Sequence, residues 1–261
     1  MRTRLTAALN GVELHSVDPA IYIQRVNEGA PGMDVSAGNR SGNVGQHLNG
    51  IYRKTLDVDV VFSVNVPKRE TARRANILQQ VSAWAATGGD MTVNYRDRQK
   101  LRVRCVSFPE ISGIDQWTDN YTLTFRAFQV PYWVSQDAES ATISAGTSGS
   151  ATLRLRESAG GKLCFEATNG SGSTVNAVTV SANGKTITFS SLGLANGEKL
   201  IGDYDNNDIQ RLRILNGSTY RSVLDKRTGA DDVLLKYGGN TVSVTSGAAL
   251  SWKVYTYGRW E

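Results

Sequence analysis

The residues that most often do acid–base chemistry are few in this sequence, and they lie without the partners that catalysis needs. The two histidines, His15 and His47, sit in polar segments, and no nucleophile motif such as GxSxG lies near either. We interpret His47, in GQHLNG, as a solvated or interface residue and not as a general base. Carboxylates are scattered, so a pair for glycoside hydrolysis stays open, but no spacing points to one. The sequence therefore predicts no catalytic residue and no enzyme.

One acidic segment has part of the spacing of a calcium loop. In DYDNND, residues 203–208, oxygen-bearing side chains stand at the first, third and fifth positions of an EF-hand-like loop. Asp208 replaces the glycine required at the sixth position, and Ile214 replaces the glutamate required at the twelfth. No helix is predicted on either side. A polar turn between strands is the better interpretation, and we expect no bound metal and no cofactor.

Five cations gather around one predicted strand. Lys100, Arg102 and Arg104 alternate along it, and Arg96 and Arg98 lie in the turn before it. A solvated strand face, a contact with acidic residues of another subunit, and the lining of a DNA channel all fit this pattern. A channel through which DNA slides fits this pattern poorly, because each contact between a cation and a phosphate holds the DNA more tightly. The formal net charge of +5 is also too small to indicate nucleic-acid binding as the main task.

The second half of the chain holds enough aromatic residues for a sugar-stacking platform. A carbohydrate-binding adsorption module that recognises a bacterial surface is therefore the main alternative function. No cluster resembles the His, Asn, Arg, Trp and Glu set of a lectin, so most of these side chains are expected in the core or in interfaces. The residues are Tyr204, Tyr220, Tyr237, Trp252, Tyr255, Tyr257 and Trp260.

Length and composition indicate a globular protein of two domains. The chain has 261 residues, of which 40% are hydrophobic and 20% are charged. Cys105 and Cys164, one in each half, are too few for a disulfide framework and lack metal-ligand spacing, which favours synthesis in a reducing cytoplasm. The N-terminal residues lack the apolar run of a signal peptide, and no stretch of about 20 apolar residues indicates a membrane span.

Alternating hydrophobic and polar residues predict several strands in the first half. In LDVDVVFSVNV, residues 56–66, the apolar side chains follow a period of two, as in a half-buried strand. Further strands are expected at 91–95, 101–105 and 121–128.

A single amphipathic helix is expected at about 69–87. Pro67 precedes it, and Gly88 and Gly89 offer a left-handed cap at its C-terminus. Its apolar residues recur at helical spacing and are expected to pack across the sheet. They are Ile77, Leu78, Val81, Trp84 and Ala85.

Residues of about 25–53 are predicted to form a long β-hairpin arm. The stretch is rich in Gly, Asn and Ser and poor in large apolar residues, so it cannot supply a buried face. Loops of this length are uncommon inside compact domains and tend to be functional or disordered. Strand-like segments flank the stretch, and about a dozen residues each way would extend roughly 35–40 Å. That length is enough to embrace a neighbouring subunit.

The second half reads as a β-sandwich that follows a linker. Residues 135–152, SQDAESATISAGTSGSAT, are interpreted as the linker. Beyond them, short strand patterns follow one another with Gly, Asn and Asp between and no helical period. We therefore predict a mainly β protein with one helix. Residues 1–135 form an N-terminal α+β domain that carries the arm, and residues 136–261 form a C-terminal antiparallel β-sandwich.

Together these features resemble the distal tail protein of long-tailed bacteriophages, the siphovirus tail component family. In the first half, the resemblance rests on LDVDVVFSV, a helix ending AWAATGG, the hairpin MTVNYRDRQKLRVRCV and the closing FRAFQVPYW, in which Val130 replaces the family's usual Asp. In the second half, GKTITF, NGEKLIGDY, VLLKYGGNTVSV and YTYGRW follow in the order of the family's galectin-like sandwich. The resemblance covers almost the whole chain and rests on order and pattern.

The resemblance implies a virion structural protein of the tail tip, or baseplate, that is synthesised in the host cytoplasm. Members of the family form a ring, expected to be a hexamer, whose N-terminal domains surround a channel that passes DNA without binding it specifically. Their arms belt adjacent subunits, and their C-terminal domains offer attachment points for receptor-binding or adhesion proteins. The other expected partners are the tail-tube protein and the tail hub or tail-associated lysin, with no membrane.

Overall fold

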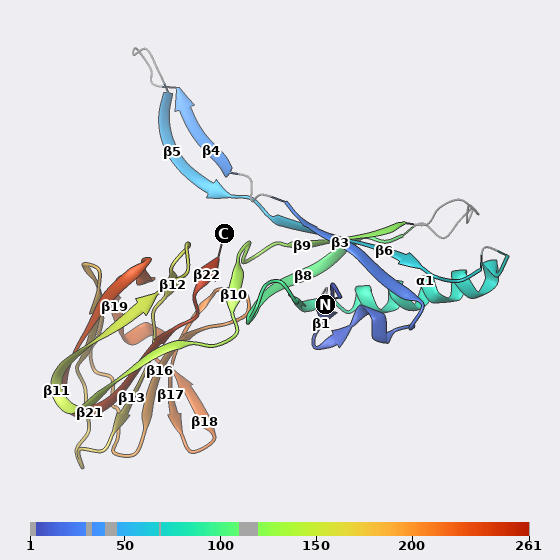
Figure 1. The fold of residues 1–261 in the computed structure, drawn as a ribbon. Coiled ribbons are helices and arrows are strands. Elements are labelled where there is room, and N and C mark those ends of the chain that lie inside the picture. Colours follow the sequence, from blue (N-terminus) through green and yellow to red (C-terminus); the bar gives the residue numbers. More distant parts are fainter. Residues whose placement is uncertain (1–3, 30–32, 40–45, 68, 110–119, 261) are drawn as a thin grey trace. The chain divides into compact units, whose positions relative to one another are not determined.

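The chain divides into two compact units, Met1–Trp133 (unit 1) and Val134–Glu261 (unit 2), each described here by itself (Figure 1). Both are built mainly of antiparallel strands, and the described residues include one α-helix. The fold class expected from the sequence is confirmed. The structure, a computed structural model, describes residues 4–29, 33–39, 46–67, 69–109 and 120–260, without the side chains of 33–39 and 46–53.

Unit 1 is organised around one antiparallel sheet. Its strands are β1 (Ala7–Leu9), β2 (Val12–Glu13), β3 (Ile21–Glu28), β6 (Leu56–Val64), β7 (Gly89–Val93), β8 (Gln99–Ser107) and β9 (Tyr121–Ala127), with a short 3-10 helix, η1 (Leu14–Ser16), after β2. They lie in the order β2, β1, β7, β8, β9, β6, β3. The strand predicted at 56–66 is thus in the interior of the sheet, between β9 and β3.

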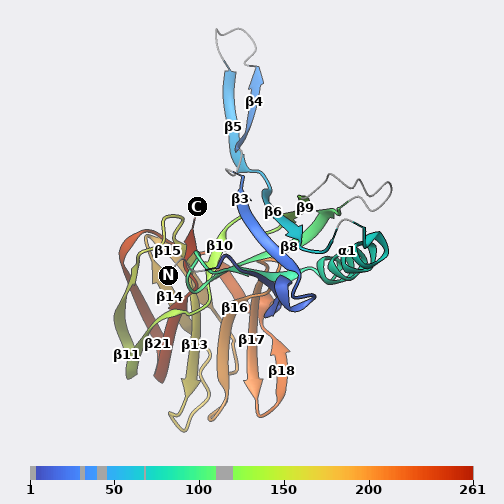
Figure 2. The same ribbon diagram turned by 45° about the vertical axis from the view of Figure 1, so that its right-hand side comes forward.

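The single helix, α1 (Thr71–Ala86), packs its apolar stripe against this sheet as the sequence predicts (Figure 2). Trp84 of α1 lies edge-on to Phe125 of β9, with ring centroids 6.0 Å apart. The indole N–H of Trp84 donates to the carbonyl of Val12 at 3.0 Å, so the packed ring also has a hydrogen-bond partner for its polar group. After the helix, Gly88 has φ +55° and Gly89 has φ +117°. These left-handed conformations favour glycine and turn the chain into β7.

The expected arm is present as a separate two-stranded sheet between β3 and β6. Its strands, β4 (Met33–Asn39) and β5 (Gln46–Arg53), pair antiparallel. Within the described part of the chain, neither pairs with any other strand. Residues 25–28, expected to belong to the arm, instead complete β3. Because a two-stranded hairpin alone is marginally stable in water, the arm gains stability when another surface adds to it.

Unit 2 is an antiparallel β-sandwich made by a curled sheet. Its strands lie in the order β18, β17, β16, β13, β21, β14, β15, β19, and β11 pairs with β21 beside this path. Their bounds, with the remaining short elements, are β10 (Trp133–Ser135), β11 (Glu139–Leu155), β12 (Gly161–Lys162), β13 (Cys164–Asn169), β14 (Val178–Ala182), β15 (Lys185–Phe189), β16 (Lys199–Tyr204), β17 (Gln210–Asn216), β18 (Thr219–Ser222), η2 (Leu224–Lys226), β19 (Arg227–Gly229), β20 (Leu234–Leu235), β21 (Gly238–Thr256) and β22 (Arg259–Trp260).

The linker expected at 135–152 is wrong, because most of this segment belongs to β11. The strand pairs with β21 along its length, from Glu139 opposite Thr256 to Leu155 opposite Gly238. One half of β21 also pairs with β14 and the other half with β13. The two long strands therefore pass from one layer of the sandwich to the other. The small polar residues that suggested a linker are held in a strand by this partner.

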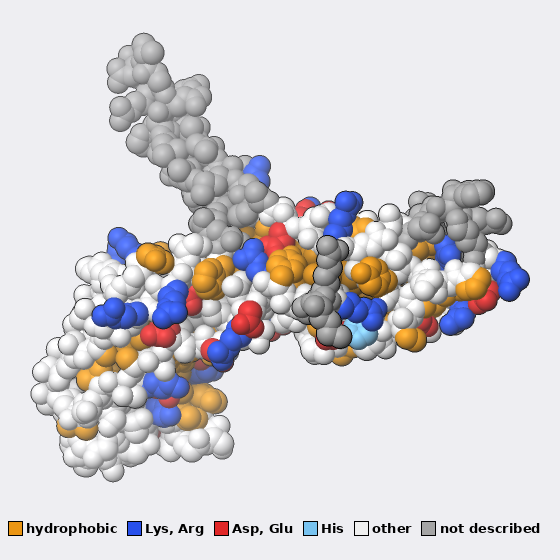
Figure 3. Space-filling view, in the orientation of Figure 1, with side chains coloured by type: hydrophobic (Ala, Val, Ile, Leu, Met, Phe, Trp, Pro, Cys, Tyr) orange, Lys and Arg blue, Asp and Glu red, His pale blue; other side chains and the backbone are white. Residues whose placement is uncertain are grey.

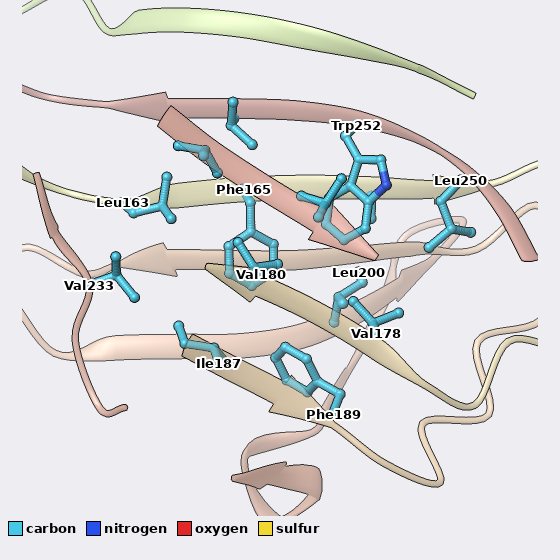
Figure 4. Close-up of a cluster of buried hydrophobic side chains, with 14 of the residues drawn as sticks. Leu163, Phe165, Val178, Val180, Ile187, Phe189, Leu200, Val233, Leu250 and Trp252 are labelled. Atoms are coloured by element: carbon cyan, nitrogen blue, oxygen red, sulfur yellow. The ribbon is translucent and has the colours of Figure 1, made fainter. Parts of the chain in front are cut away.

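The core of unit 2 lies between these layers (Figure 4). Phe165 of β13 lies edge-on to Phe189 of β15, with ring centroids 6.2 Å apart, and 6.4 Å from the ring of Trp252 on β21. A Cβ at Gly202 would lie 2.4 Å from the Phe165 ring, so β16 needs a glycine where it crosses this ring. Rings from several strands thus fix the spacing of the layers.

Candidate assembly surface

A cluster of four side chains fixes the root of the arm. Glu28 is the last residue of β3, immediately before the arm. Its carboxylate accepts hydrogen bonds from the hydroxyl of Tyr95 at 2.6 Å, from the guanidinium of Arg96 at 2.5 and 3.1 Å, and from the indole N–H of Trp133 at 3.0 Å. The Arg96 guanidinium also lies over the Trp133 ring, 5.4 Å from its centroid. We call these four residues the arm-root cluster.

The arm-root cluster keeps its carboxylate charged. Partial burial by itself would raise the pKa of Glu28, but the hydrogen bonds from Arg96, Tyr95 and Trp133 and the charge of Arg96 lower it below its usual value. Burial, and the negative charge and hydrogen bond of Glu28, raise the pKa of Tyr95. Because the ionised carboxylate accepts all these bonds, the cluster is strongest when Glu28 is charged.

The second strand at the arm root is held by an ion pair across the sheet. Asp57 on β6 lies directly opposite Arg126 on β9. The guanidinium donates from Nε and Nη2 to the two carboxylate oxygens, both at 2.7 Å. The hydrogen bond from Arg126 lowers the pKa of Asp57, and burial opposes it only in part. On the other side of β6, the N–H of Gly29, the residue after β3, donates to the carbonyl of Asp57 at 2.8 Å. Both strands that lead into the arm are therefore tied to the body of unit 1.

Three of the five cations of the predicted basic stripe pair with carboxylates within unit 1. Lys100 and Arg102 both pair with Asp90 of β7, at 2.8 and 3.2 Å. Arg96 belongs to the arm-root cluster, and Arg104 lies opposite Arg126 in the sheet. On the face in view, Lys and Arg side chains are interspersed with Asp and Glu and form no single basic patch (Figure 3). This arrangement favours a mixed-charge contact surface over a DNA-retaining surface.

Among the described residues, the side chains considered for catalysis or metal binding do not gather in one place. His15 lies in η1, with its Nδ1 2.8 Å from the carboxylate of Glu13. The side chain of His47 lies outside the described residues. Burial raises the pKa of the Cys164 thiol to about 12 and also raises that of Cys105, which leaves little reactive thiolate at neutral pH.

The acidic segment at 203–208 covers the end of β16 and the turn that follows it, and its carboxylates are already engaged. Asp205 accepts the backbone N–H groups of Asn207 and Ile209 at 2.8 and 3.0 Å, as in a polar turn. Asp203 pairs with Arg211 and Arg213, and Asp208 pairs with Lys162 and Arg259. Across the described residues, no group of three or more His, Cys, Asp or Glu side chains could hold a metal ion.

The aromatic residues of unit 2 lie in different environments. Trp252 is in the core, so it cannot belong to a sugar-stacking platform. Tyr204 lies under the amine of Lys162, and Tyr220 lies under the guanidinium of Arg213, each 4.6 Å from the ring centroid. Tyr237 is 72% exposed.

None of the helices in the described segments is long and apolar enough to cross a membrane.

Comparison with known proteins gives a match in structure. No protein-family model matches the chain, and no curated protein is significantly similar to it in sequence. The Dit protein (gp 19.1) of phage SPP1, described as a paradigm of the hub adsorption apparatus in phages that infect Gram-positive bacteria, matches with a TM-score of 0.69. The match covers 97% of this chain and 98% of that chain, at 15% sequence identity. The chain has the fold of SPP1 Dit.

The likeness to SPP1 Dit spans both units and confirms, at the level of the fold, the resemblance to distal tail proteins. A chain of the phage P2 baseplate in its activated conformation is more distant than SPP1 Dit. With Ca, it has a TM-score of 0.47 and 8% identity, covering 98% of each chain. With Sr, the TM-score and identity are again 0.47 and 8%, covering 97% of each chain. Scores this low add nothing to the assignment of the fold.

Proposed function

We propose that this protein is a structural component of a bacteriophage tail tip. Its copies assemble into a ring that joins the tail tube to the tail hub and to adhesion proteins. The fold shared with SPP1 Dit over nearly the full length of both chains is the observation that carries this proposal. The task is one of binding and positioning, with no reaction catalysed, and the protein acts in the virion after synthesis in the host cytoplasm.

The arm and its root support an assembly role. Each strand leading into the arm is tied to the body of unit 1, by the arm-root cluster on β3 and by the Asp57–Arg126 pair on β6. The hairpin beyond the root has no further strand partner in the described chain. A firmly rooted hairpin with open edges suits a contact with a neighbouring subunit. Such a head-to-tail contact between identical chains can close into a ring.

The charge pattern of unit 1 suits a ring whose channel passes DNA without holding it. Retention of DNA grows with each phosphate that a cation neutralises. Lys100 and Arg102 are already paired with Asp90, so these cations are less available to phosphates. The same mixed charges can set the register of a subunit contact.

The mass of the purified protein in solution tests this proposal. We expect light scattering at tens of micromolar to give a hexamer of the 28.3 kDa chain, with the contact made through unit 1. A strictly monomeric protein, alone and with the tail hub added as a template, would contradict the proposal.

A further inference from the structure

The two outer faces of the sandwich in unit 2 carry different kinds of side chain. One layer consists of β14, β15, β19 and the first half of β21. Its outward side chains are hydroxyls in rows across the strands: Thr228, Thr188, Thr179 and Thr245 in one row, and Thr186, Ser181 and Ser243 in the next. The other layer consists of β13, β16, β17 and β18, which lie side by side in both ribbon views (Figures 1 and 2), and the second half of β21. Its outer face is charged and aromatic.

The charged face is made by the residues that alternate with the core residues of these strands. Leu200 and Leu212 point into the core, so Ile201 and Arg213, which lie opposite each other, point outward. The outward residues stand in rows across the strands: Arg211 and Asp203; then Arg213, Ile201, Glu166 and Lys253; then Tyr220, Leu215, Lys199, Thr168 and Ser251. We call these residues, together with Tyr255 and Tyr257, the basic–aromatic face.

Positive charge exceeds negative charge on the basic–aromatic face, where two carboxylates stand among four cations. The ion pairs are Arg211–Asp203 at 3.2 Å, Arg213–Asp203 at 2.6 Å and Lys199–Glu166 at 3.0 Å. Lys253 lies directly opposite Glu166, but within the described residues no carboxylate is close enough to pair with it. Its amine lies 5.4 Å from the centroid of the Tyr255 ring instead. The excess of cations can be balanced by the carboxylates of a partner.

The aromatic rings of this face are exposed and yet held in position. The Arg213 guanidinium lies over Tyr220, 4.6 Å from the ring centroid, and Tyr255 meets Tyr257 edge-on, with centroids 6.2 Å apart. Tyr220 and Tyr257 are 53% and 44% exposed. Tyrosine and arginine are enriched in the contact surfaces of proteins, and side chains that are already fixed lose little entropy on binding. The composition of the face and the positions of its side chains therefore favour a protein partner.

We propose that the basic–aromatic face of unit 2 is a docking surface for a protein that presents carboxylates. These carboxylates pair with Lys253 and with the arginines that share Asp203, while apolar side chains of the partner pack on Tyr220 and Tyr257. Arg213 and Lys253 lie in one row with two strands between them, so partner carboxylates roughly 14 Å apart reach both. A nucleic acid fits less well, because the carboxylates of the face repel its phosphates. The partner is expected among the proteins of the tail tip, which rests on the function proposed above.

The affinity of the full-length protein for a labelled peptide of ten glutamates, measured by fluorescence anisotropy at low salt, tests the docking surface. At about 3.3 Å per residue, the extended peptide spans roughly 33 Å and can reach both Arg213 and Lys253. Arg211→Gln/Lys253→Gln should weaken binding roughly fivefold or more, as expected for the loss of two exposed ion pairs. Lys185→Gln/Lys236→Gln is the matched control, because it removes the same charge from exposed positions of unit 2 outside the face. The control should keep the parental affinity.

Melting curves show whether each variant is folded, and light scattering on the same samples reports ring formation separately. A parent that binds the peptide without forming rings would contradict the proposed ring but support the docking surface. No binding by the parent, or an equal loss in both double variants, would overturn the proposal. Tighter binding of a ten-nucleotide oligothymidylate, lost in Arg211→Gln/Lys253→Gln, would also overturn it, because the face would then be a nucleic-acid site.

Discussion

The carboxylate of Glu28 lies 2.5 Å from the guanidinium of Arg96 and joins the end of β3 to the turn between β7 and β8, 68 residues further along the chain. Both side chains are largely buried, at 17% and 24% exposure. Trp133 covers Arg96 and donates to the same carboxylate, so the pair is screened from water on one side. This contact fixes where the arm leaves the sheet.

Glu28→Gln should lower the stability of unit 1 by about 2 kcal/mol, because hydrogen bonds to the charged carboxylate are lost within a partly buried cluster. Urea unfolding of the full chain, followed by the fluorescence of unit 1 tryptophans, measures the change. Glu70→Gln is the control, since the Glu70–Arg73 pair is exposed and its ends are 3.4 Å apart. It should cost less than about 1 kcal/mol. Equal losses in the two variants would argue against a special role of the arm-root cluster.

Stability should depend on pH through Glu28 and Asp57. The pKa of each is lowered in the folded protein from ordinary values of 4.5 and 3.8. Their contribution is therefore complete above the ordinary values and is lost as pH falls through the lowered ones. The double variant Glu28→Gln/Asp57→Asn should be less stable than the parent at neutral pH. Its stability should decline less steeply than that of the parent on acidification below about pH 4.5. Parallel curves of unfolding free energy against pH would contradict this assignment.

Removal of the arm should separate assembly from folding. A variant in which residues 30–53 are replaced by a short turn keeps β3, β6 and the arm-root cluster. Because loop-closure free energy changes slowly with length, the stability of unit 1 should change by about 1 kcal/mol or less. Light scattering should show that the variant no longer forms the parental particle, while its melting curve matches that of the parent. A particle of parental size would place the subunit contact on the sheet faces instead.

Unit 2 should fold alone only if β11 is kept. A fragment of residues 134–261 should unfold in one cooperative thermal transition. A fragment that starts at Arg156 lacks all of β11, and with it the buried side chains of Ile143, Leu153 and Leu155 and the whole ladder between β11 and β21. The loss of these three buried side chains removes roughly 5 kcal/mol or more of hydrophobic stabilisation. Circular dichroism compares the two fragments, and an equally stable shorter fragment would show that β11 is dispensable.

The local patterns of the sequence were sufficient for α1, β6 and the arm. In β6 the apolar residues alternate because one face of the strand is buried, and this period of two is visible without any partner. The helix was visible because its apolar stripe, the preceding proline and the following glycines agree with one another. The arm was visible because residues 30–53 cannot supply a buried face.

The features that were missed depend on residues far apart in the sequence. The polar composition of β11 is typical of a linker, and its extended conformation comes from pairing with β21 about a hundred residues later. The arm-root cluster joins Glu28 to Arg96 and Trp133, 68 and 105 residues away, so no local pattern indicates it. A partial signal existed, since Glu28 is a lone carboxylate where a strand enters the arm and Trp133 ends the aromatic FRAFQVPYW segment.

Unit 2 should show no strong sugar binding. The exposed Tyr237 is the best remaining candidate for a stacking residue, because Trp252 is in the core. Calorimetry with cell-wall polysaccharide should detect no affinity in the micromolar range for the parent. Such an affinity, if lost in Tyr237→Ala and kept in the exposed control Tyr220→Phe, would support the carbohydrate-binding alternative.

Negative-stain electron microscopy of the purified full-length protein tests the central claim most directly. The assembly role predicts ring-shaped particles with a central hole in views along the axis, and their loss in the variant without residues 30–53. A field of single, compact two-lobed particles, with the protein intact and the tail hub present, would contradict it.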